Sequence, residues 1–128
     1  MAHFMSPYAA PTYAILRIVS GLLFMQHGSQ KLMSFPVDAY EGMAWHILWV
    51  AGPIELIGGG LIMIGLFTRW AAFISSGLMA VAYWIAHGLD GLFPLANGGE
   101  LAVLYCFIFL MIAGNGSGIW SVDGGSDS

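Results

Sequence analysis

Charged residues are scarce in this sequence, and their scarcity excludes most classes of soluble protein. Only 8% of the 128 residues are Asp, Glu, Lys or Arg, while 59% are hydrophobic and the mean hydropathy is +0.81. Soluble domains carry about a quarter charged residues. A compact soluble domain of this length could not bury so much apolar surface. The lipid bilayer is therefore the expected environment and partner.

Basic residues and cysteine are rarer still. Three Lys and Arg residues against seven acids give a net charge of −4, so no basic cluster is available for nucleic acid. The single cysteine, Cys106, excludes an intramolecular disulfide and a CxxCH attachment site, so no covalently bound cofactor is expected. The first apolar stretch has no Lys or Arg before it and contains Arg17, which indicates a retained membrane helix rather than a signal peptide.

Four apolar stretches are candidates for membrane-spanning helices, at residues 11–31, 43–67, 70–87 and 99–116. Pro36 should end the first helix, and Pro53 should disturb the second. Residues 117–128 are rich in Gly, Ser and Asp and are expected to form a mobile tail. The sequence thus predicts an all-α integral membrane four-helix bundle in a single domain, residues 1–128.

An even number of spans places both termini on one side of the membrane. Arg17 and Arg69 lie toward that side and Lys31 toward the other, which favours cytoplasmic termini. Trp120, near the end of the chain, is interpreted as an interfacial anchor.

Ionisable residues within a membrane are costly, and each one therefore needs a partner or a function. One helical stripe of the first span carries Arg17, Gly21, Phe24, Gly28 and Lys31. Arg17 is expected to extend to the near membrane surface, with Glu55 as the alternative partner.

Counting 1.5 Å per residue along antiparallel helices places Glu55 near the membrane centre and the other polar groups between the centre and the far surface. The predicted polar cluster, and the candidate ligand-binding set, is His27, Lys31, Glu55, His87, Asn97 and Glu100. His46 lies nine residues before Glu55 and should point the opposite way, toward the membrane interface.

Three interpretations of this cluster stay open. Lys31 and Glu100 could simply extend to water while Glu55 bonds a neighbouring helix, the cluster could line a pocket for a polar head such as a quinone, or it could contact another subunit. Haem is not expected, because nothing fixes the separation of His27 and His87. A metal site is not expected either, because the candidate ligands come from separate segments without ligand spacing.

Several ordered motifs resemble the DoxX family of small four-helix bacterial membrane proteins. They are "LRIVSGLLFMQHGSQKL", "GPIELIGGGLIMIGLFTR", "NGGELAVLY" and "GIWSVD", which together cover roughly Leu16 to Asp123. The resemblance implies a four-helix membrane bundle, and it makes the positions of HGxxKL, the second-helix glutamate, GLFTR and NGGEL candidate pocket residues. It also implies a link to redox physiology, because family members include a subunit of a thiosulfate:quinone oxidoreductase.

The favoured functional hypothesis is therefore a redox-associated subunit of the bacterial inner membrane that binds quinone or a similar small molecule, together with other membrane protein subunits. The alternative is a non-catalytic structural or assembly subunit of a larger membrane complex. No residue is assigned a catalytic role, so the sequence leaves open whether the protein is an enzyme. Transport is the weakest hypothesis, because four helices without an inverted repeat suit alternating access poorly.

Overall fold

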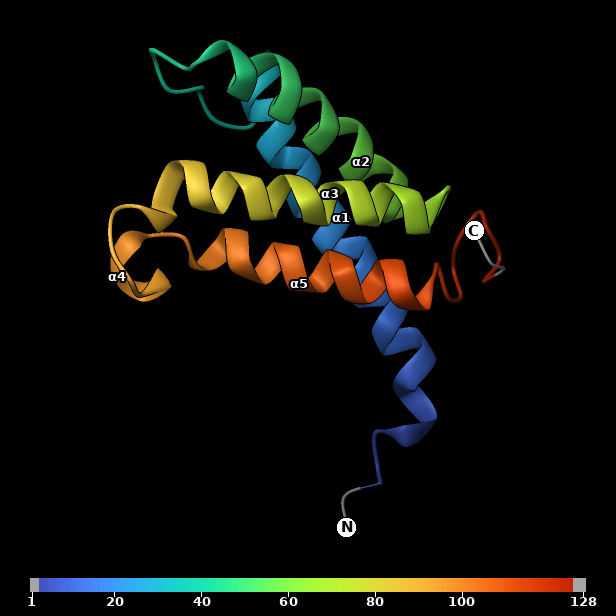
Figure 1. Ribbon diagram of the computed structural model, residues 1–128. Coiled ribbons are helices and arrows are strands. Elements are labelled where there is room, and N and C mark those ends of the chain that lie inside the picture. Colours follow the sequence, from blue (N-terminus) through green and yellow to red (C-terminus); the bar gives the residue numbers. More distant parts are fainter. Residues whose placement is uncertain (1–2, 126–128) are drawn as a thin grey trace.

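The computed structural model describes residues 3–125, and within that range every regular element is helical. Four long helices and several short ones follow one another along the chain (Figure 1). The elements are η1 (Ser6–Tyr8), α1 (Ala9–Met33), the π-helical turn η2 (Ile47–Ala51), α2 (Gly52–Ile64), α3 (Thr68–Tyr83), the π-helical turn η3 (Trp84–Gly88), α4 (Pro94–Asn97) and α5 (Glu100–Asn115).

Three of the long helical segments have the length and apolar composition needed to cross a membrane. They are Ser6–Met33, Ile47–Ile64 and Thr68–Gly88, and the apolar helix α5 is shorter. The predicted all-α membrane bundle is confirmed. Pro36 follows the end of α1 as expected, and the irregularity expected near Pro53 takes the form of the π-helical turn η2.

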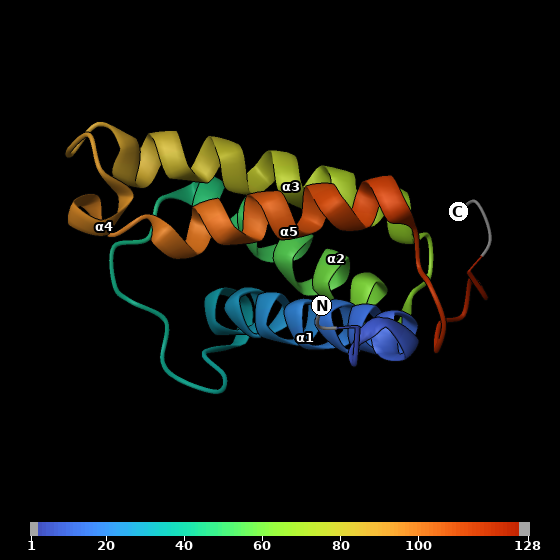
Figure 2. The same cartoon turned by 90° about the horizontal axis from the view of Figure 1, so that it is seen from below.

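The helices pack as two antiparallel pairs. α1 packs along α2, α3 packs along α5, and α2 contacts α3 between the pairs. Figure 2 shows α3 and α5 side by side, with α2 lying between them and α1. Long helices that are consecutive in sequence, α1 and α2, α2 and α3, and α3 and α5, are therefore neighbours in space.

Two pairs of glycines bring the backbones of α1 and α2 into contact. A Cβ atom on Gly21 would lie 2.7 Å from the Gly59 carbonyl oxygen, and one on Gly28 would lie 2.7 Å from the Gly52 carbonyl oxygen. Both pairs are spaced seven residues apart, so both glycines of each helix lie on one face. Small residues permit this approach in membranes, where packing rather than hydrophobicity holds helices together.

Aromatic rings join α1 to α5 in the middle of the bundle. The fully buried ring of Phe24 has its centroid 4.7 Å from that of Phe109 and 5.3 Å from that of Tyr105. On the neighbouring α3, Ser76 donates a 2.7 Å hydrogen bond to the Cys106 carbonyl oxygen of α5. The stripe predicted on the first helix is thus the face of α1 that the rest of the bundle buries.

Arg17 is fully buried, so the expectation that it extends to the membrane surface is wrong. Its guanidinium donates to five carbonyl oxygens, those of Ile62, Met63, Ser117, Ile119 and Trp120. Two of these carbonyls, those of Ile62 and Met63, belong to the last turn of α2, where the helix no longer supplies its regular donors, and the Ile62 carbonyl also accepts from the Gly65 amide at 3.2 Å. Arg17 does not bond Glu55 either, because these carbonyls use all of its nitrogens.

The segment after α5 is folded back onto the bundle, so the mobile tail predicted from residue 117 is wrong for residues 117–125. Asp123 accepts hydrogen bonds from the Phe67 and Thr68 amides and the Thr68 hydroxyl, at 2.9–3.2 Å, and thereby caps α3. Arg69 donates to the Ala113 and Gly114 carbonyls at the end of α5. Residues 126–128 of the predicted tail lie outside the described residues.

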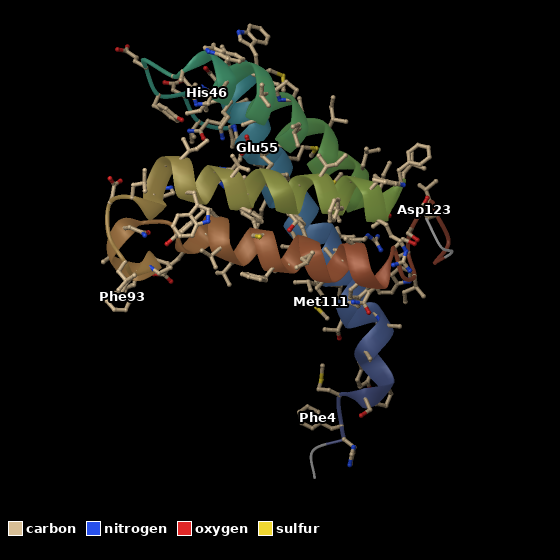
Figure 3. All side chains as sticks on the ribbon, viewed as in Figure 1. Phe4, His46, Glu55, Phe93, Met111 and Asp123 are labelled. Atoms are coloured by element: carbon tan, nitrogen blue, oxygen red, sulfur yellow. The ribbon has the colours of Figure 1, made fainter. Side chains whose placement is uncertain are left out.

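We call this region the Arg17 end. It comprises Arg17, the C-terminus of α2, the N-terminus of α3 and residues 116–125. Figure 3 shows Asp123 on the opposite side of the bundle from His46. The other half of the molecule, which holds Lys31 and His46, is called the Lys31 end.

Candidate functional site

A cavity of about 660 Å³ lies at the Lys31 end, and all the long helical segments contribute to its wall. Its volume falls within the range of pockets that hold drug-sized molecules. Both π-helical turns border it, and such turns occur often at functional sites. The lining consists of Phe24, His27, Lys31, Tyr40, Trp45, His46, Ile47, Val50, Ala51, Glu55, Leu78, Met79, Val81, Ala82, Ile85, Ala86, His87, Gly98, Leu101, Ala102 and Tyr105.

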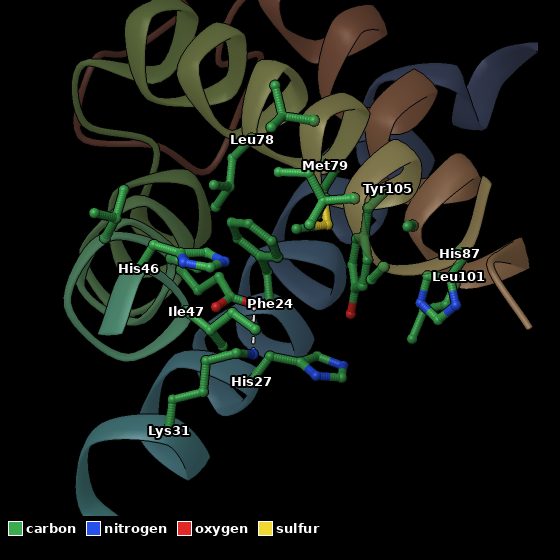
Figure 4. A pocket seen from close by; sticks show the side chains of 18 of the residues that line it. Phe24, His27, Lys31, His46, Ile47, Leu78, Met79, His87, Leu101 and Tyr105 are labelled. Atoms are coloured by element: carbon green, nitrogen blue, oxygen red, sulfur yellow. Dashed lines mark hydrogen bonds and ion pairs between the residues drawn. The ribbon is translucent and has the colours of Figure 1, made fainter. Parts of the chain in front are cut away.

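An ion pair forms the most polar part of the wall. Lys31 Nζ lies 3.0 Å from Glu55 Oε1, and the two side chains are 13% and 5% exposed (Figure 4). Lys31 occupies the last turn of α1, where the helix dipole favours a cation. The glycine contact at Gly28 and Gly52 brings α1 and α2 close together one turn away, so the two side chains can meet. Of the two carboxylates predicted to cluster with Lys31, Glu55 and Glu100, the structure thus brings Glu55 to it.

Two polar atoms beside the Lys31–Glu55 ion pair are not used in hydrogen bonds within the described part of the chain. Glu55 Oε2 is buried and has no hydrogen-bond partner among residues 3–125. Buried polar atoms are normally bonded, so such an atom needs an explanation. In the described part of the chain the Tyr105 hydroxyl also makes no hydrogen bond, and Figure 4 shows it directed into the same space as the Lys31 ammonium.

Three histidines border the cavity. The His27 ring lies nearly perpendicular to Tyr105, with 5.9 Å between ring centroids, and His87 Nδ1 lies 3.2 Å from the Asn97 carbonyl oxygen. The third is His46, which was predicted to point away from Glu55. That prediction assumed α-helical turns between the two residues, whereas the wider π-helical turn η2 intervenes and rotates His46 toward the cavity.

Asn97 holds the loop beside the cavity and is not part of its wall. Its side-chain amide donates to the Tyr83 hydroxyl at 2.9 Å and to the Gly91 carbonyl at 3.2 Å, and its Oδ1 accepts from the Gly99 amide at 2.9 Å. These bonds fix the turn that leads into α5. Its proposed role as a ligand-binding residue stays a prediction.

Glu100 lies apart from the cluster in which it was predicted. It is exposed at the start of α5 and is not part of the cavity wall. The reason is rotational, because α5 turns Tyr105 inward and five residues at 3.6 per turn place Glu100 about 140° away from it. Arg69, a candidate pocket position by family resemblance, lies at the Arg17 end and binds the carbonyls that end α5.

A second, smaller cavity of about 270 Å³ adjoins the first. His27, Leu101 and Tyr105 border both cavities. The remaining lining residues of the smaller cavity come from α1 and the following loop, and they are Leu23, Gln26, Gln30, Pro36 and Val37.

Sequence reasoning missed Tyr105, His46, Trp45 and Tyr40 as residues of the cavity wall. A signal existed for Tyr105, because it shares helical spacing with Phe109 and Ile112, which are both buried. No comparable signal existed for Tyr40 and Trp45, which lie in and after an irregular loop whose path depends on the rest of the fold.

The site combines a large apolar wall with a few polar groups of different character. Lys31 donates, Glu55 accepts, Tyr105 does either, and neutral histidine offers one donor and one acceptor. Among residues 3–125, no group of three or more His, Cys, Asp or Glu side chains is placed to hold a metal ion. The arrangement suits an uncharged, largely apolar molecule that carries oxygen atoms able to hydrogen-bond.

Comparison with known proteins identifies the class to which this membrane bundle belongs. The DoxX family profile matches residues 12–88, which include Arg17, Lys31, Glu55 and Arg69. The chain is therefore a member of the DoxX family, as its motifs predicted. It is a multi-pass membrane protein.

Two curated relatives extend the similarity over most of the chain. An uncharacterized protein of Haemophilus influenzae is 46% identical over 116 residues, which are 86% of this chain and 87% of the relative. An uncharacterized membrane protein of Mycobacterium tuberculosis is 28% identical over 133 residues, covering 88% of this chain and 80% of the relative. No solved structure gives a significant match.

Proposed function

We propose that this protein binds a quinone or a similar small lipophilic molecule in the cavity at the Lys31 end. The observation that carries the proposal is an apolar cavity of about 660 Å³ whose wall includes the Lys31–Glu55 ion pair. Lys31 uses one of its three N–H donors on Glu55 and retains others for a ligand oxygen. His27, His46 and His87 border the same space and could exchange protons with the bound molecule.

The apolar wall favours a ring over a charged metabolite. Phe24, Leu78 and Met79 come from two helices and face the cavity, and Tyr105 adds an aromatic face. The adjoining cavity of about 270 Å³ offers space for an apolar tail. A ligand that partitions into the bilayer would meet such a site without crossing water.

The proposal places the protein in the bacterial inner membrane as a redox-associated subunit, with both termini in the cytoplasm. The distribution of the three cations along the chain supports this orientation, because Arg17 and Arg69 lie at the end of the bundle where residues 116–125 fold back, whereas Lys31 lies at the other end. Partner subunits would supply any electron transfer beyond quinone binding.

The test is quinone binding to the purified full chain in detergent, measured by calorimetry with a ubiquinone analogue that has a short saturated tail. Ala82 lines the cavity, so the ring in Ala82→Phe should project into it, obstruct the ligand and weaken binding at least about tenfold, the equivalent of about 1.4 kcal/mol. Gly77 lies on the same helix with open space around its Cβ position, so Gly77→Leu is the matched control and should bind normally.

Binding that is unaffected by Ala82→Phe would show that the quinone does not occupy this cavity. Failure of the wild-type protein to bind, together with its stoichiometric recovery in a larger complex from mild detergent, would favour the alternative of a non-catalytic structural or assembly subunit. Glu100→Gln serves as a second control, because Glu100 is an acid outside the cavity wall.

A further inference from the structure

The unpaired oxygen of Glu55 indicates which form of a quinone the cavity accommodates. Lys31 bonds Oε1 at 3.0 Å, whereas Oε2 is buried without a partner among the described residues. Leaving a buried acceptor atom without a hydrogen-bond donor is costly, so a bound group that donates a hydrogen bond to Oε2 would remove an existing penalty. A group that only accepts hydrogen bonds would leave that penalty in place.

A quinone and its quinol differ in this respect. A quinone carbonyl oxygen only accepts, so it can take an N–H from Lys31 but can give nothing to Glu55. A quinol hydroxyl can accept from Lys31 and donate to Glu55 Oε2 at once. The terminal torsion of a glutamate is broad and twofold, so the carboxylate can turn Oε2 toward the cavity while it keeps the ion pair.

Other polar groups of the cavity wall offer a place for the second ring oxygen. The Tyr105 hydroxyl and the His27 ring both border the cavity, and Figure 4 shows them beside the Lys31 side chain. Tyr105 and neutral His27 can each donate or accept, so they tolerate either form of the ligand at that position. Discrimination between the two forms therefore depends on Glu55.

We infer that the cavity prefers a hydroxyl-bearing aromatic ring, the quinol, to the corresponding quinone. This inference rests on the proposed quinone site. Tighter binding of the reduced form raises the midpoint potential of the bound couple, and each tenfold preference corresponds to about 30 mV for a two-electron couple. The bound molecule would then be easier to reduce than the free one.

The experiment compares the dissociation constants of one short-tailed ubiquinone analogue in its oxidised and its dithionite-reduced form, measured anaerobically on the purified full chain. We expect the quinol to bind at least about tenfold more tightly. Glu55→Gln should abolish or invert this preference, because an amide that gives its oxygen to Lys31 presents a donor to the ligand. Glu100→Gln is the matched control and should keep the wild-type preference.

A third ligand tests the inference without any variant. The dimethyl ether of the quinol keeps the ring and both oxygens but has no O–H group, so it should bind no more tightly than the quinone. Equal affinity for quinol, quinone and ether would overturn the inference and leave the proposed quinone site standing. A tenfold preference that survives in Glu55→Gln would also overturn it, and binding of neither redox form would overturn the proposed function itself.

Discussion

The two ends of the bundle treat buried charge in different ways. At the Arg17 end, the guanidinium is fully buried and donates to five backbone carbonyls. At the Lys31 end, Lys31 and Glu55 bond each other beside a cavity, and one carboxylate oxygen has no partner among the described residues. Buried charge is tolerated when it is fully paired, so the Arg17 end stabilises the fold while the Lys31 end keeps capacity for a ligand.

The strongest test of this contrast is Arg17→Met. The substitution removes the donor from five carbonyls at once, and buried acceptors without partners are costly, so we expect the free energy of unfolding to fall by roughly 3–5 kcal/mol. Thermal unfolding in detergent measures the loss. Arg17→Lys keeps the charge but has fewer donors and should lose less. If Arg17→Met melts like the wild type, the Arg17 end does not stabilise the fold as argued.

A second test concerns the glycine contact that positions the Lys31 end. Gly28→Ala would place a Cβ atom against the backbone of α2 near Gly52 and should destabilise the protein by about 1–3 kcal/mol. Gly77→Ala adds the same methyl group where no atom lies within 4 Å, and it should be neutral or slightly stabilising. Equal melting temperatures for the two variants would contradict the close approach of α1 and α2.

The smallest effect on stability is expected when both members of the ion pair are made neutral. Lys31→Met alone leaves Glu55 buried without its partner and should be destabilising, whereas Lys31→Met combined with Glu55→Gln should return to within about 1 kcal/mol of the wild type. A double-mutant cycle on melting in detergent gives the coupling between the two residues. The double variant should nevertheless bind the quinone analogue weakly. A large loss of stability in the double variant would show that the Lys31–Glu55 pair, like Arg17, stabilises the fold.

Much of the architecture could be predicted because it depends on local patterns. Length, hydropathy and the scarcity of charge indicate a helical membrane bundle, and the stripe from Arg17 to Lys31 identifies the buried face of α1. Pro36 and Pro53 mark irregular points, since proline lacks the amide hydrogen that a helix needs. The motifs also identify the DoxX family, and its profile confirms that membership.

The candidate site could be predicted only in part. Lys31 and Glu55 meet as expected because they lie on the faces of α1 and α2 that carry the contacting glycines. Counting residues failed where the count assumed a uniform helix, so His46, which is exposed as an interfacial residue should be, was not expected to border the cavity. Glu100 was assigned by its depth and by the NGGEL motif, and neither fixes the rotation of a helix about its axis.

The sequence by itself determined that the chain forms apolar helices and that a few ionisable residues must find partners within them, because hydropathy and periodicity are local properties. Tertiary structure alone decided which partners they find. Arg17 donates hydrogen bonds to carbonyls of α2 and of residues 117–120. Both segments are distant from Arg17 in sequence, so only the folded chain brings these groups within hydrogen-bond distance. The cavity beside Glu55 likewise exists only once the helices are packed, since its volume is the space that their side chains leave unfilled.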